Sequence, residues 1–125
     1  MPAKKILIID DDPSVTELLK LKLEAAGALV ATSNAARQAI ELAGSFAPQL
    51  IVCDIDLGQD GDGGMIAHEL AKNPATTRVP ILFLSSMVTP ADSVRQSGGR
   101  RLISKKIPIA EIVELILNEA GRKPA

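Results

Sequence analysis

Short, continuous runs of apolar residues recur along the chain and predict buried strands. The runs are rich in Ile, Leu and Val and do not alternate with polar residues, which is the pattern of strands covered on both faces of a parallel sheet. They occupy residues 5–9, 29–32, 50–54, 81–85 and 101–104. A chain of this pattern needs helices on both faces of the sheet to cover these strands.

The segments between these runs carry apolar residues at helical spacing. In the clearest, residues 13–26, Asp12 is placed to cap the helix, Pro13 to begin it and Gly27 to end it. Weaker stripes predict helices at residues 36–43, 66–70 and 109–120. The segment 87–99 has few apolar residues, and a short or irregular helix is predicted there. Strands that alternate with helices indicate a five-stranded parallel α/β sheet with right-handed crossovers.

Composition and charge narrow the class of protein. A length of 125 residues with 46% hydrophobic residues predicts one domain spanning residues 1–125. The formal net charge of −1 and the absence of Trp and Tyr argue against a nucleic-acid surface or a membrane-attracted one. The single Cys53 excludes an internal disulfide, and the N-terminal apolar run is too short for a signal peptide, so a cytoplasmic location is expected.

Polar side chains gather where the predicted strands end. Asp10 and Asp11 follow the first strand and Asp54 ends the third. The fourth and fifth strands end in a hydroxyl pair and an ammonium pair, Ser85 with Ser86 and Lys105 with Lys106. In open parallel sheets, ligands bind beyond the carboxyl ends of the strands. Three converging carboxylates need a counter-charge, and Mg²⁺ prefers such oxygen ligands. The hydroxyl and the ammonium would complete a cradle for a phosphoryl group.

Taken one at a time, several of these residues are explained by a structural role and need no function. Asp12 is explained as a helix cap, and an isolated lysine or serine in a loop is ordinary surface. His68 lies on a predicted helix and is assigned no role, and Cys53 is buried packing next to Asp54. The functional reading therefore depends on the acidic, hydroxyl and basic groups occurring together at four strand ends.

As a set, these residues resemble the receiver domain of response regulators in two-component signal transduction. The resemblance covers essentially the whole chain and implies a flavodoxin-like, doubly wound sheet of strand order 2-1-3-4-5. It implies that Asp54 accepts a phosphoryl group from a phosphohistidine of a sensor histidine kinase or phosphotransfer protein. Asp11 would bind Mg²⁺ or Mn²⁺ directly, Asp10 mainly through water, and Asp56 through its backbone carbonyl. The phosphoryl oxygens would be held by the hydroxyl and ammonium residues at the last two strand ends, which are Ser85, Ser86 and Lys105.

The resemblance also implies a regulator rather than a classical enzyme, limited to self-phosphorylation from small donors and autodephosphorylation. A downstream protein would contact the face formed by the segment 87–99, the strand 101–104 and the helix 109–120. Neither a nucleic acid nor a membrane is expected as a direct partner.

Two alternatives remain open at this point. The Asp54-Ile55-Asp56 triplet also matches the D-x-D motif of haloacid-dehalogenase-type phosphatases, although those enzymes place it after the first strand. A receiver-like module that binds partners without phosphorylation is the other, and the complete set of polar residues argues against it. Phosphate-loop and calcium-loop readings of residues 54–64 fail because the GK[ST] ending and the bidentate Glu are missing.

Three positions depart from the usual receiver pattern and are expected to modulate the site. Lys106 stands where the family usually has a cis proline, and a cis bond at another residue costs about 2.5 to 4 kcal/mol. Leu102 stands where many receivers carry a switching Tyr or Phe, so signalling through an aromatic rotamer is not expected. Asp56 adds a carboxylate beside the acceptor, and the hypothesis is that it tunes autodephosphorylation.

Overall fold

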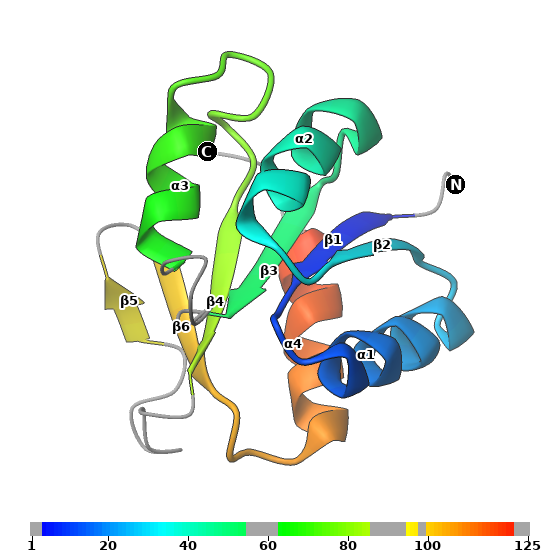
Figure 1. Ribbon diagram of the computed structural model, residues 1–125. Coiled ribbons are helices and arrows are strands. Elements are labelled where there is room, and N and C mark those ends of the chain that lie inside the picture. The colour runs from blue at the N-terminus through cyan, green and yellow to red at the C-terminus, as the bar shows by residue number, and fades with distance from the viewer. Residues whose placement is uncertain (1–3, 55–62, 86–94, 98–99, 122–125) are drawn as a thin grey trace.

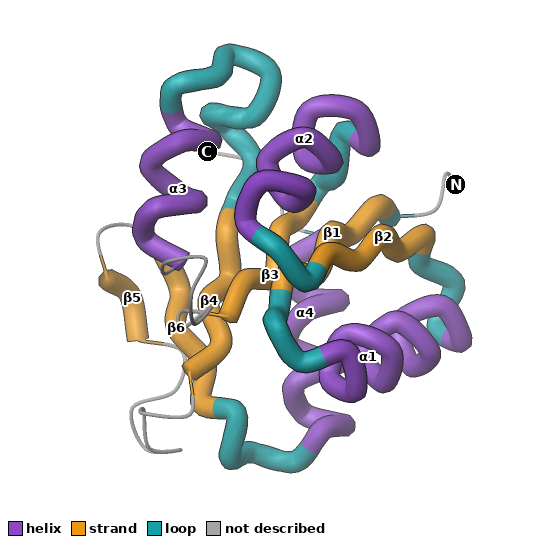
Figure 2. The backbone as a smooth tube through the Cα atoms, in the orientation of Figure 1, coloured by secondary structure: helices purple, strands orange, loops and turns teal. Residues whose placement is uncertain are grey.

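The structure is a computed structural model that describes residues 4–54, 63–85, 95–97 and 100–121. Helices and strands alternate along most of the chain (Figures 1 and 2). The strands are β1 (Lys5–Ile9), β2 (Leu29–Ser33), β3 (Leu50–Asp54), β4 (Ile81–Ser85), β5 (Arg95–Ser97) and β6 (Arg100–Ser104). The helices are α1 (Pro13–Ala25), α2 (Ala36–Phe46), α3 (Gly63–Ala71) and α4 (Ile109–Ala120).

The strands form one sheet in the order β2-β1-β3-β4-β6-β5. The pairs from β2 to β6 are all parallel, so the predicted order 2-1-3-4-5 is confirmed, with β6 as the fifth parallel strand. In this arrangement the carboxyl ends of β1, β3, β4 and β6 meet at one edge of the sheet.

The prediction of a short or irregular helix over 87–99 is wrong for residues 95–97. These residues form β5, which runs antiparallel to β6 and pairs Gln96 with Arg101. In the sequence, Gly98-Gly99 separates the two strands, and such a dipeptide is typical of a two-residue hairpin connection. The rest of the predicted helix, residues 87–94 and 98–99, lies outside the described residues.

Helices cover both faces of the sheet (Figure 1). Side chains of β1 alternate between two apolar clusters, with Ile6 and Ile8 packing toward α1 and α4 and Leu7 and Ile9 packing toward α2 and α3. These four side chains are at most 1% exposed. Burying one such side chain contributes about 1.5 to 3 kcal/mol, which explains why the strand is apolar at every position after Lys5.

The ends of α1 follow the sequence prediction. The carboxylate of Asp12 accepts a hydrogen bond from the Ser14 backbone N–H at 3.0 Å, as an N-cap does. At the other end Gly27 has a φ of 97°, and the Gly27 and Ala28 N–H groups donate to carbonyls of the last turn, those of Glu24 and Leu23. The hydrogen bonds from Ser14 lower the pKa of Asp12 below its ordinary value. Asp12 is therefore fixed by its local turn, and α1 begins immediately beside the strand-end aspartates.

Among the residues that the structure describes, no helix has both the length and the apolar character needed to cross a membrane.

Candidate functional site

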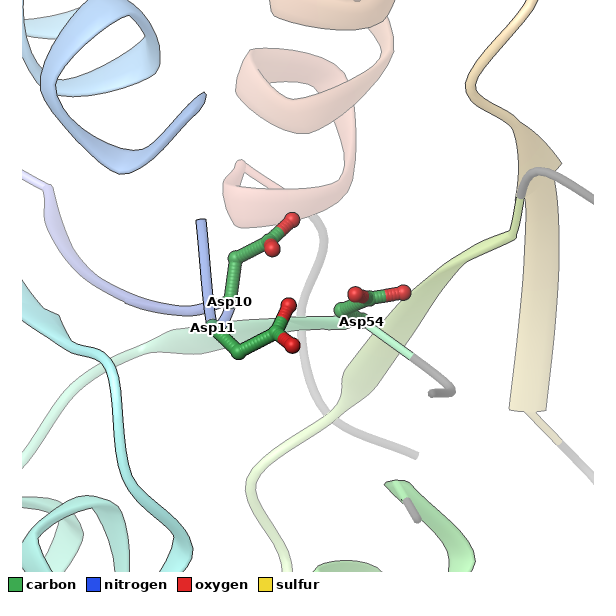
Figure 3. Close-up of side chains that lie close together, drawn as sticks. All are labelled: Asp10, Asp11 and Asp54. Carbon is green, nitrogen blue, oxygen red and sulfur yellow. The ribbon is translucent and has the colours of Figure 1, made fainter. Parts of the chain in front are cut away.

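Three carboxylates meet at the carboxyl edge of the sheet. Asp10 and Asp11 follow β1, and Asp54 is the last residue of β3, the neighbouring strand (Figure 3). One carboxylate oxygen from each lies within 4.8 Å of the others. The structure therefore brings together residues that are more than forty positions apart in the sequence, as the strand-end argument predicts.

Asp10 is held by its backbone and by its side chain. Its N–H donates to the Ser33 carbonyl at 3.1 Å, and its own carbonyl accepts from Asn34 Nδ2 at 2.7 Å. Its carboxylate Oδ1 accepts from the Asp12 N–H at 3.0 Å. The residue is only 1% exposed, so its carboxylate depends on these donors and on a nearby cation for compensation.

Lys105 supplies a positive charge to this cluster. Its Nζ lies 2.9 Å from Asp10 Oδ2 and 3.1 Å from Asp54 Oδ2, so one ammonium bridges the ends of β1 and β3. The backbone N–H of Lys105 donates to the Ser85 carbonyl at 2.9 Å, which ties the start of this loop to the end of β4. Asp54 is 6% exposed and Ser85 3%, so the ammonium enters a largely enclosed site.

Two residues of the site, Asp11 and Lys105, have pKa values raised above their ordinary values. Loss of surrounding water raises the pKa of the Asp11 carboxyl above its ordinary 3.8, and the neighbouring Asp10 raises it further. Burial acts to lower the pKa of Lys105, but hydrogen bonds and charge attraction from Asp10 and Asp54 outweigh it and raise that pKa above 10.5. The acidic cluster therefore favours extra positive charge, since one ammonium faces three carboxyl groups.

This set of donors fits a hard divalent cation. Mg²⁺ takes oxygen ligands and uses one or two carboxylates together with waters and phosphate oxygens. Asp11 is exposed while Asp10 and Asp54 are buried, so the cluster opens to solvent on the Asp11 side. Asp10, Asp11 and Asp54 are the described residues that would hold such an ion.

Other residues predicted for the site have different outcomes. Asp56 and Ser86 lie outside the described residues, as does all of the segment 55–62 between β3 and α3. Leu102 is described only as part of the β6 backbone, where it pairs with Phe83. Lys106 is exposed and does not reach the carboxylates in any ion pair of the described residues. No cis peptide bond occurs in the described part of the chain, so the Lys105–Lys106 bond is trans.

Two residues beside the site were not singled out from the sequence. Asn34 donates to the carbonyl of Asp10, and the hydroxyl of Ser104 accepts from the Lys106 N–H at 3.0 Å. Both are short polar side chains next to strand ends, where Asn and Ser commonly hold turns. Their roles depend on which backbone group lies within reach, which the sequence pattern does not specify.

Comparison with known proteins agrees with this geometry. Residues 6–117 match the family model of the response regulator receiver domain. The chain is 30% identical over 125 residues to the DNA-binding dual master transcriptional regulator RpaA of Synechocystis, covering 96% of this chain and 52% of RpaA. It is 25% identical to the polar-differentiation response regulator DivK of Brucella ovis, covering 94% of this chain and 97% of DivK. The chain thus spans about half the length of RpaA but nearly all of DivK.

A solved structure is similar over the whole chain. The non-phosphorylated HemR receiver domain of Leptospira biflexa superposes with a TM-score of 0.80 at 25% identity, covering 98% of each chain. The chain belongs to the response regulator receiver domain family of two-component systems, and its fold is the flavodoxin-like fold of that family. Members of the family act with histidine kinases or phosphotransfer proteins and with downstream effectors, as phospho-acceptor regulators rather than classical enzymes.

Proposed function

We propose that Asp54 of this chain accepts a phosphoryl group from a phosphohistidine of a sensor kinase or phosphotransfer protein, with Mg²⁺ or Mn²⁺ bound, and that this changes the surface read by a partner. The observation that carries the proposal is the cluster of Asp10, Asp11 and Asp54 within 4.8 Å, with Lys105 bonded to two of the three. This arrangement provides a nucleophile, oxygen ligands for a cation and a fixed positive charge at one point.

The chemistry follows from these groups. One oxygen of Asp54 forms a bond to phosphorus while the bond from phosphorus to the donor's imidazole nitrogen breaks, and the imidazole leaves with that electron pair. A carboxylate is a weak nucleophile, so the rate depends on positioning and on neutralising charge in a loose transition state. A divalent cation, when bound, supplies part of that neutralisation.

The residues around Asp54 would act on the phosphoryl oxygens. Lys105 already contacts the acceptor carboxylate at 3.1 Å, so its ammonium is in place to pair with an oxygen of the product. Ser85 ends β4 directly beside β3 and would donate its hydroxyl to another oxygen. Asp10 and Asp11 would hold the cation rather than the phosphoryl group, because their charge repels phosphate.

The output is proposed to be contact with another protein through β6, α4 and the segment 87–99. The DNA binding named for RpaA belongs to a protein of which this chain covers 52%. The net charge of −1 gives no reason to extend DNA binding to this chain.

The test is phosphorylation by a small donor. Wild-type protein and the Asp54→Asn variant are incubated with acetyl phosphate, with Mg²⁺ or with EDTA, and followed by intact-mass spectrometry. We expect one phosphoryl adduct that is labile in both acid and base, as an acyl phosphate is, in wild-type protein with Mg²⁺ only. Adducts of equal yield in Asp54→Asn would contradict it. Continuous release of phosphate from many phosphoesters would instead indicate the phosphatase alternative.

A further inference from the structure

The loop that carries Lys105 is fastened on both sides of this residue. On the preceding side, the Lys105 N–H donates to the Ser85 carbonyl at 2.9 Å. On the following side, the Lys106 N–H donates to the hydroxyl oxygen of Ser104 at 3.0 Å. The two peptide groups that flank Lys105 are therefore each held by a hydrogen bond, and together they fix the direction in which its side chain leaves the backbone.

Ser104 is well placed to hold this turn. It is the last residue of β6, it pairs with Ser85 in the sheet register, and it is 0% exposed. A buried hydroxyl is a rigid acceptor, because the surrounding packing leaves it few positions and its loss of water must be offset by hydrogen bonds. A serine oxygen that accepts from the N–H two residues later is a local motif that sets a turn.

The hydrogen bond to Ser104 requires the backbone N–H of Lys106. A proline at this position would have no N–H to donate, whereas Lys106 has one and uses it. The peptide between Lys105 and Lys106 is trans, and the Lys106 side chain is exposed. The turn is thus held by the Ser104 hydroxyl and the Lys106 N–H, while the Lys106 side chain stays in solvent.

The direction of the Lys105 side chain matters because its ammonium must contact two carboxylates at once. Its Nζ meets two carboxylates at 2.9 and 3.1 Å from a residue whose side chain has four rotatable bonds to restrict. A change of direction at the backbone would separate the ammonium from one carboxylate or from both. We propose that Ser104 is a positioning residue for Lys105, which holds the Lys105 ammonium between Asp10 and Asp54 through its hydrogen bond to the Lys106 N–H. The link to phosphorylation rests on the proposed function, and the link to the position of Lys105 does not.

The first part of the test needs no phosphodonor. Exchange of the Lys105 ammonium protons with water is measured by nitrogen-15 NMR in wild-type protein, with the signal assigned by its absence from Lys105→Met. In Ser104→Ala we expect exchange about fivefold faster, the factor for loss of one ordinary hydrogen bond. Thr76→Val is the matched control, because Thr76 is also buried and its hydroxyl donates to the Leu70 carbonyl at 2.6 Å, on the segment that precedes β4. This control should leave the exchange rate unchanged.

The second part is a double-mutant cycle on acetyl phosphate phosphorylation. Ser104→Ala should slow the reaction about fivefold in the wild-type background and have no further effect in the Lys105→Met background. Unchanged ammonium exchange in Ser104→Ala would overturn the proposal. So would an equal increase in Thr76→Val, or equal slowing in both backgrounds. If wild-type protein is not phosphorylated at all, the proposed function fails, and the exchange measurement still decides the role of Ser104.

Discussion

Lys105 Nζ and Asp10 Oδ2 lie 2.9 Å apart although ninety-five positions separate the two residues in the chain. The contact links the ends of β1 and β6, across the ends of β3 and β4 that lie between them. It places a cation against a carboxylate that is only 1% exposed, so neither charge is easily removed without a penalty. The site is therefore a structural element of the fold as well as the place proposed for its chemistry.

Replacement of Lys105 should destabilise the protein. In Lys105→Met the buried Asp10 carboxylate loses its cation, and the free energy of unfolding should fall by about 1 to 3 kcal/mol when Mg²⁺ is absent. Urea unfolding in EDTA measures this. Lys106→Met is the matched control, since the Lys106 side chain is exposed, and it should stay within about 0.5 kcal/mol of wild type.

The same pair of variants tests the assignment of function between the two lysines. Phosphorylation by acetyl phosphate, and any conformational change that follows it, should be impaired more in Lys105→Met than in Lys106→Met. The reverse ranking would mean that Lys106, and not Lys105, serves the phosphoryl group.

The contribution of the Lys105 charge to the free energy of unfolding is fully present below pH 10.5. It should be lost as the pH rises through the raised pKa of Lys105 in the folded state.

Neutralising Asp11 should stabilise the metal-free protein. The pKa of Asp11 is raised above 3.8 in the fold, so the folded state holds this proton more tightly, and ionisation costs stability as the pH rises from that value. At pH 7 in EDTA, Asp11→Asn should be more stable than wild type by up to about 1 kcal/mol, the scale of a solvent-screened interaction. The difference should vanish below pH 3.8.

Mg²⁺ should reverse the order of stability between wild type and Asp11→Asn. Added Mg²⁺ should stabilise wild type by mass action and stabilise Asp11→Asn much less, because the variant lacks one proposed ligand. Glu17→Gln, an exposed change of the same charge on α1, controls for net charge and should respond to Mg²⁺ as wild type does. An Asp11→Asn variant that gains as much from Mg²⁺ as wild type would exclude Asp11 as a ligand.

Two leucines on α1 should differ sharply in their contribution to stability. Leu23 is 0% exposed and Leu21 is 65% exposed, although both lie on the same helix. Leu23→Ala leaves a cavity in the cluster under α1 and α4 and should cost about 2 to 5 kcal/mol. Leu21→Ala should change the free energy of unfolding by less than about 0.5 kcal/mol. Chemical denaturation of the two variants gives the comparison, and similar losses would contradict the described packing of α1.

Two glycines should respond to alanine with opposite signs. Gly27 has a φ of 97°, and a Cβ there would meet no atom within 4 Å, so Gly27→Ala should cost about 1 kcal/mol through backbone strain alone. Gly44 lies within α2 with the same open space around it, so Gly44→Ala should gain about 0.5 to 1 kcal/mol. Thermal unfolding of both variants tests the pair, and a stabilised Gly27→Ala would show that the helix end is not left-handed.

Much of the fold follows from the sequence because the parallel strands are buried on both faces. The run at residues 50–54 has no polar residue before its last position, Asp54, and its bounds coincide with the observed strand. β5 could not be predicted in this way. Its residues Arg95-Gln96-Ser97 carry no apolar signal, and they are a strand only because β6 offers a partner.

The residues of the site also differ in whether the sequence could predict them. Asp10, Asp11, Asp54 and Lys105 could be predicted because parallel strand ends meet at one edge, whatever the details of each loop. Ser104 could not, because its contribution depends on a single backbone N–H within reach of its hydroxyl. The signal that could have pointed to it is a serine two positions before a residue that has an N–H where proline is usual.

We propose that Asp54, and no other carboxylate of the cluster, carries the phosphoryl group. The most direct measurement is borohydride reduction of protein treated with acetyl phosphate, which converts an aspartyl phosphate to homoserine, followed by peptide mapping. We expect homoserine at position 54 alone, formed with Mg²⁺ and absent in EDTA. Homoserine at position 10, 11 or 56, or equal conversion of position 54 in EDTA, would contradict it.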